Sequence, residues 1–75
     1  MGTASVLLLQ CLGVPNCTVH FEPEGAVHVL RAEDHFRVEC VPPDGEPIEI
    51  AYHGDSISVF YAERAINKAG QELKL

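Results

Sequence analysis

The sequence has little positive charge. Its 75 residues contain five lysines and arginines against eleven aspartates and glutamates, and the formal net charge is −6 at pH 7. A surface with so few cations cannot neutralise several phosphates of a nucleic acid, and it is repelled by anionic lipid headgroups. We therefore expect neither nucleic acid nor a membrane among the partners of this protein.

Long hydrophobic runs are also missing near the N-terminus. The apolar run there, Val6–Leu9, is not preceded by lysine or arginine. It is shorter than the roughly 7–15 residues of a signal-peptide core and far shorter than the roughly 20 residues of a membrane-spanning helix. We interpret this run as the first strand of the fold and expect a cytoplasmic location.

Cysteine is scarce, and the number of cysteines is odd. The three are Cys11, Cys17 and Cys40, whereas a secreted mini-domain usually pairs an even set. We therefore expect three reduced thiols, with Cys17 and Cys40 on the core side of their strands. A Cys11–Cys17 disulfide is the alternative, and it requires two closely facing residues.

Motifs of common enzymes are absent from the chain. We find no glycine-rich nucleotide-binding loop, zinc-protease motif or serine-nucleophile elbow. Ser56 and Ser58 share a face with His53, but alternation along a short strand produces such neighbours by default. A domain of this size has little volume for a substrate pocket. We therefore expect a non-enzymatic protein without an organic cofactor.

Hydrophobic residues nevertheless make up 47% of the chain, which is too many for intrinsic disorder. Turn-forming residues separate short runs in which apolar and polar residues alternate, as in β-strands. The pattern predicts a single all-β domain over residues 1–75, a small antiparallel meander of about five to seven strands that forms a sandwich or barrel-like sheet. The alternating runs lie at 18–22, 27–29, 35–40, 48–53 and 56–61.

The C-terminal segment fits two structures. Apolar residues recur at helical spacing over about residues 60–69, with good helix formers between them, and Gly70 is suited to end a helix. The same segment fits a final hairpin that turns at Ala69-Gly70. We expect the hairpin, because strands precede it, and an α+β fold with a C-terminal helix is the alternative.

The turn at Gly54-Asp55 predicts the register of one hairpin. Glycine at the first central position suits a two-residue type II′ loop. That loop places the apolar residues of both strands on one face, and its opposing pairs are His53 with Ser56, Tyr52 with Ile57, and Ile50 with Val59.

A candidate metal site follows from the turn at residues 23–25. As a three-residue loop, this turn makes His20 and His28 direct cross-strand partners on the polar face. A next turn at Glu33-Asp34 places Glu39 opposite His28 on a third strand, whereas a longer turn places Arg37 there and opposes a metal. Two imidazoles and a carboxylate suit Zn²⁺, so His20, His28 and Glu39 are candidate ligands.

The function expected from these features is that of a binding module. It engages a protein partner, or self-associates as a homodimer through the weakly charged first strand, because unprotected strand edges template further strands. The alternative is a metal- or pH-responsive β domain that uses its surface histidines.

Overall fold

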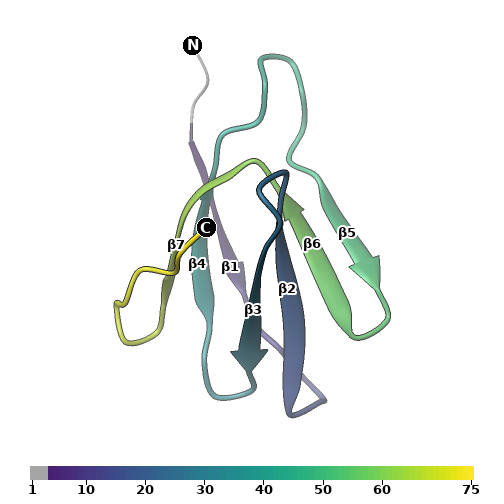
Figure 1. Cartoon of the computed structure of the whole chain (residues 1–75), viewed down its shortest axis with the longest axis vertical. Helices are drawn as coiled ribbons and strands as arrows, with labels where there is room; N and C mark the ends of the chain where they lie inside the picture. The colour runs from purple at the N-terminus through teal and green to yellow at the C-terminus, as the bar shows by residue number, and fades with distance from the viewer. Residues whose placement is uncertain (1–3) are drawn as a thin grey trace.

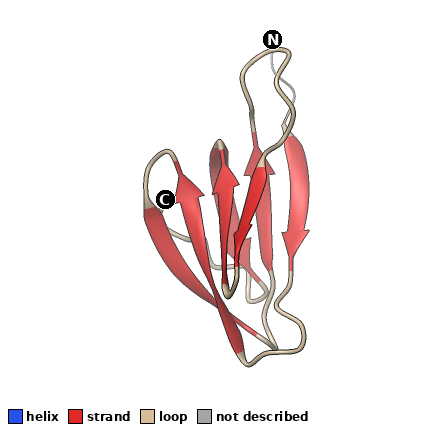
Figure 2. Ribbon diagram, turned by 90° about the vertical axis from the view of Figure 1, so that its right-hand side faces the viewer, coloured by secondary structure: helices blue, strands red, loops and turns tan. Residues whose placement is uncertain are grey.

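The computed structural model describes residues 4–75 as seven β-strands, and this part of the chain contains no helix (Figure 2). The all-β expectation is confirmed, and the last strand occupies the segment that also fitted a helix. The strands are β1 (Ser5–Leu9), β2 (Asn16–Glu22), β3 (Ala26–Arg31), β4 (Phe36–Cys40), β5 (Ile50–His53), β6 (Ser56–Phe60) and β7 (Ala62–Asn67).

The strands form two sheets of unequal width that pack as a sandwich (Figure 1). Three strands in the order β1-β4-β7 form what we call the narrow sheet, and four strands in the order β3-β2-β6-β5 form the wide sheet. Neighbouring strands are antiparallel except for β2 and β6, which are parallel. The chain therefore changes sheet repeatedly, whereas in a simple meander consecutive strands stay side by side.

The core lies between the two sheets. Alternate residues of each strand point into it, as the period of two predicts. Phe21 of β2 is fully buried at its centre, and the ring of Phe36 from β4 lies 6.4 Å from the Phe21 ring between centroids. Burying a side chain of this size contributes about 1.5–3 kcal/mol to the free energy of unfolding. A small number of such residues therefore stabilises the fold.

The β5–β6 hairpin has the expected register. Gly54 has a φ of +67°, which the first central position of a type II′ turn requires, and Asp55 has an ordinary negative φ. The structure pairs the three residue pairs that the sequence predicted, which are His53–Ser56, Tyr52–Ile57 and Ile50–Val59.

The β2–β3 hairpin differs from its expected register by one residue. Phe21 and Ala26 are its last paired residues, with residues 22–25 between them, and Val19 pairs with His28. Because the side-chain period of a strand is two, a slip of one residue turns every side chain of β3 to the opposite face.

The reason for this slip lies at the far end of the hairpin. The three-residue loop would have placed Arg31 opposite Cys17 on the core side, where an unpaired charge is costly to bury. The observed register places Leu30 opposite Cys17, and Leu30 is fully buried. Val27 and Val29, expected in the core, face outward and are exposed.

The C-terminal tail covers the free edge of β7. Glu72 pairs with Ile66 of β7, and Leu73 and Leu75 pack against the core. The expected final hairpin is therefore confirmed, and its turn spans residues 68–70, which include Ala69-Gly70.

Tyr61 carries the chain from the wide sheet into the narrow sheet. Its φ is 64°, in the left-handed region that favours glycine. The Tyr61 N–H donates to the Glu22 carbonyl at 2.7 Å, and the Tyr61 carbonyl accepts from the Val41 N–H at 2.9 Å. These two bonds hold a conformation that costs a non-glycine residue about 1–2 kcal/mol.

The backbone strain at Tyr61 can be measured with two substitutions. We expect Tyr61→Val to be less stable than Tyr61→Gly by about 1–2 kcal/mol in urea denaturation, because both remove the ring but only valine keeps the penalty for positive φ. The control is the same pair at Tyr52, which lies in extended backbone, where valine is expected to be the more stable. Equal stabilities of the two Tyr61 variants would contradict the assigned conformation.

Candidate functional site

A disulfide joins the two sheets where the chain leaves β1. Cys11 and Cys17 are bridged, with 5.9 Å between their Cα atoms. The expectation of three reduced thiols is therefore wrong for this pair, because folding brings the end of β1 opposite the start of β2. Cys40 is a free, buried cysteine, and burial raises the pKa of its thiol, as in an inert core residue.

Reduction of this disulfide is expected to lower the free energy of unfolding by about 2 kcal/mol, because so short a closed loop restricts the unfolded chain by that amount. Urea unfolding with and without a phosphine reductant measures the difference. Thiol titration of unreduced, unfolded protein should find one thiol, that of Cys40, and a Cys40→Ala variant should show none. Three reactive thiols without reductant would contradict the bridge.

The structure does not bring the three candidate metal ligands together. His20 pairs with Val27 on the outer face of the wide sheet, whereas His28 lies on the inner face. Glu39 belongs to the narrow sheet, where its carboxylate lies 3.7 Å from the Arg64 guanidinium. Within residues 4–75, no three His, Cys, Asp or Glu side chains lie close enough to hold a metal ion.

His28 has a structural environment instead. Its ring lies at the margin of the core, 5.8 Å from the Phe21 ring and 6.5 Å from the Phe36 ring between centroids. Its Nε2 is 2.8 Å from the carbonyl oxygen of Lys74, to which it donates. His28 thereby ties the C-terminal tail to β3.

The serine beside His53 is not oriented by the imidazole. The Ser56 hydroxyl donates to the main-chain carbonyl of His53 at 3.3 Å. A nucleophilic serine requires a base within hydrogen-bond reach of its hydroxyl, and this contact does not provide one.

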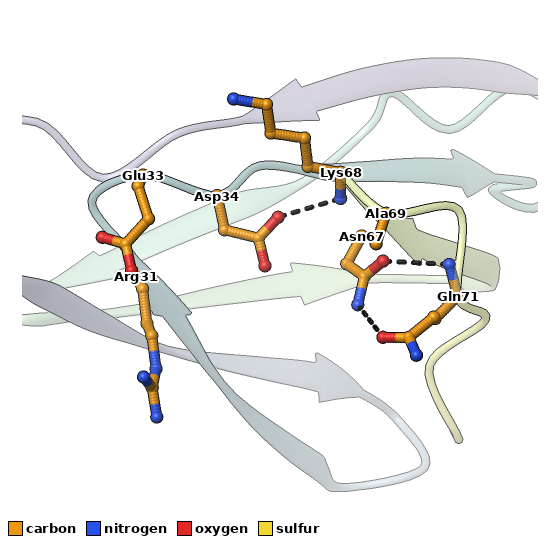
Figure 3. A pocket seen from close by; sticks show the side chains of 7 residues that line it. All are labelled: Arg31, Glu33, Asp34, Asn67, Lys68, Ala69 and Gln71. Carbon is orange, nitrogen blue, oxygen red and sulfur yellow. Dashed lines mark hydrogen bonds between the residues drawn. The ribbon is translucent and has the colours of Figure 1, made fainter.

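A polar hollow of about 380 Å³ lies where the β3–β4 turn meets the turn after β7 (Figure 3). Oδ1 of Asp34 accepts the backbone N–H of His35 at 2.7 Å and that of Lys68 at 2.8 Å. The side chains of Asn67 and Gln71 hydrogen-bond each other at 3.0 Å. Because these polar groups satisfy one another, the hollow is a junction that joins two turns.

The junction predicts a pH dependence of stability. The N–H of Lys68 holds the pKa of Asp34 below its usual range, partial burial opposes this, and the N–H of His35 adds to it. A carboxyl whose folded pKa is depressed stabilises the fold above its unfolded pKa of about 3.9, and this stabilisation is lost as the pH falls through the folded value.

Asp34→Asn keeps an oxygen acceptor but removes the charge. We expect this variant to be less stable than the wild type at pH 7, with a difference that shrinks as the pH falls below about 4. Thermal unfolding of both proteins between pH 7 and a pH below about 4 measures this difference in stability. A difference that is constant with pH would show that the charge of Asp34 does not contribute.

An uncovered apolar surface, which we call the groove, lies on the side of the molecule where β1 and β5 are the edge strands of their sheets. On this side the wide sheet extends beyond the narrow sheet, and β5 is the strand farthest to the right of β1 in Figure 1. Ile50 and Tyr52 are on the inner face of β5, yet they are 49% and 75% exposed because no strand covers them. They form the floor of the groove together with Ile57.

The side of the groove is the edge of β1 itself. Within residues 4–75, only β4 pairs with this strand, so its other edge presents unpaired backbone groups. The strand Ser5–Leu9 carries no charge, and Val6 and Leu8 are each 57% exposed. The sequence indicated this edge, and the structure adds the apolar floor beside it.

The groove deepens at the Leu9 end of β1. A hollow of about 470 Å³ lies there between the loop after β1 and the β5–β6 hairpin. Leu12 and Val14 of the loop line it on one side, and Tyr52 and Ile57 line it on the other. The Cys11–Cys17 disulfide also lines this hollow.

Acidic residues stand at both ends of the groove. Glu46 and Glu49 are exposed in the β4–β5 connection, and Glu49 directly precedes Ile50 at the start of β5. Asp55 lines the hollow at the opposite end. The site therefore combines an apolar floor, a free strand edge and negative charge at its two ends.

Comparison with known protein families, curated proteins and solved structures found no match for this chain. Among the residues that the structure describes, no helix has the length and apolar character needed to cross a membrane. The surface itself is thus the source of information about function.

Proposed function

We propose that this protein is a non-enzymatic interaction module that binds an extended segment of a partner protein as a further strand beside β1. One observation carries the proposal: β1 has an uncharged free edge, and on the same side of the sandwich the inner residues Ile50 and Tyr52 of the edge strand β5 are uncovered. An added strand would hydrogen-bond to the β1 backbone and place alternate side chains on this floor, as in other complexes formed by strand addition.

The widths of the sheets support one added strand. Neighbouring strands in a sheet lie about 4.8 Å apart, and packed sheets lie about 10 Å apart. The narrow sheet has three strands and the wide sheet has four, so one strand added at β1 makes them equal. It would extend the narrow sheet on the side where the inner residues of β5 are uncovered.

A single segment fits this groove better than a second copy of the whole domain. A two-fold axis that pairs β1 antiparallel with its copy stands perpendicular to the narrow sheet, and both wide sheets then lie on the same side. Each wide sheet extends beyond β1, so the two β5 strands would meet in the same space. A homodimer through β1 therefore requires β5 to move.

The charges indicate the chemistry of the partner segment. Glu46, Glu49 and Asp55 at the ends of the groove, and the net charge of −6, favour lysine or arginine at the ends of the segment. The apolar floor favours aliphatic or aromatic residues at the alternate positions that face it.

The disulfide favours one kind of compartment for this binding. The cytoplasmic location expected from the sequence stays a prediction, and the Cys11–Cys17 bridge favours an oxidising compartment, because cytoplasmic reductants keep most thiols reduced. We therefore propose that the partner is met where disulfides persist.

A synthetic peptide tests strand addition. We expect capped Lys-Val-Thr-Val-Thr-Val-Lys, or its leucine or phenylalanine analogue, to shift amide NMR signals of β1 and β5. N-methylation of the residues whose N–H groups face β1 should abolish binding. Ile50→Ser should weaken it about tenfold, since apolar contact is lost. The matched control is Val27→Ser, since Val27 is 53% exposed on the outer face.

Two results would overturn this proposal. The first is the absence of amide shifts with all three peptides, or shifts that map to the Val27 face. The second is a dimer in sedimentation equilibrium that Val6→Lys abolishes and Val27→Lys does not, because a second copy would then be the occupant. A monomer that binds the peptides supports the proposal.

A further inference from the structure

We infer that the hollow beside the Cys11–Cys17 disulfide is an anchor pocket for one large apolar side chain of the bound segment. The inference rests on the proposed function. It specifies which position of the segment is recognised by its side chain and which residues of this chain recognise it.

The size and lining of the hollow fit such a side chain. Its volume of about 470 Å³ leaves room for one large side chain. Four of its lining residues are Leu12, Val14, Tyr52 and Ile57, whose side chains are largely apolar, and Asp55 is its acidic residue. Leucine, phenylalanine or tryptophan is therefore favoured over a polar side chain.

The exposure of Leu12 indicates that the wall of the hollow formed by the loop after β1 contacts a partner. Leu12 is 79% exposed, the highest value among the large hydrophobic residues in the described part of the chain. Tyr52 faces the same hollow and is 75% exposed. Two large apolar side chains that are exposed to solvent on opposite walls of one hollow indicate an interaction site.

The covalent structure holds the Leu12 wall in place. The disulfide closes the loop at both ends, and the carbonyl of Pro15 accepts the Ala32 N–H at 3.0 Å. A wall that is already ordered loses little conformational entropy when a ligand binds. The bridge therefore has a consequence for affinity as well as for stability.

The alternation along β1 directs one residue of the segment into the hollow. Leu7, Leu9 and Cys11 have the same parity, and Leu9 and Cys11 are buried toward the core. Directly opposite residues of paired strands point to the same face. In a segment paired antiparallel with β1, the residue that passes Cys11 lies near the N-terminal end and points inward above Tyr52 and Ile57.

The test compares peptides that differ at this position. The reference peptide is capped Lys-Phe-Thr-Val-Thr-Val-Lys. Replacing its phenylalanine with serine should weaken binding about tenfold, and replacing its last valine with serine should weaken binding by a smaller factor. Leu12→Ser and reduction of the disulfide should each remove the phenylalanine advantage. Val29→Ser, an exposed valine on the outer face, should retain it.

The outcomes distinguish the pocket from strand addition. Equal binding of the phenylalanine and serine peptides would overturn the anchor pocket and leave strand addition intact. If no peptide binds, the proposed function fails. Toluene then serves as a probe of the hollow alone: shifts of the Leu12 and Ile57 amides that Leu12→Ser abolishes support an apolar pocket, and their absence overturns it.

Discussion

The apolar contact between β2 and the narrow sheet is the interaction on which the rest of the structure depends. β2 lies inside the wide sheet with β3 on one side and β6 on the other, and its residues Val19 and Phe21 are fully buried. A chain this short has one thin core, so strands close to β2 are covered and the strand farthest from it is not. That strand is β5.

The edges of the two sheets differ because of this arrangement. The C-terminal tail covers β7, and the hydrogen bond from His28 to Lys74 holds the same tail beside β3. No comparable contact within residues 4–75 pairs with the free edge of β1. The exposed edge and the exposed floor of β5 thus lie on the same side of the molecule, which is what makes a groove there.

Charged and polar residues mostly connect strands, turns and the C-terminal tail to one another through ion pairs and hydrogen bonds. Arg64 on β7 contacts Glu39 at 3.7 Å and Glu72 at 2.8 Å, and Asp34 links two turns through backbone N–H groups. Exposed ion pairs of this kind contribute little to stability, but they position the tail and the turns. The apolar side chains of the groove, by contrast, stay exposed, and no other part of the described chain covers them.

The sequence by itself determined the strands, most of the turns and the β5–β6 register, because alternation and the preference of Gly54 for positive φ act over a few residues. It predicted the wrong register for the β2–β3 hairpin, because loops of three and four residues are both locally acceptable at this turn. Only the tertiary structure decided between them, through the burial of Leu30 and the exposure of Arg31. The disulfide and the groove were likewise beyond the sequence, because they depend on which distant strands pair and how far one sheet extends past the other.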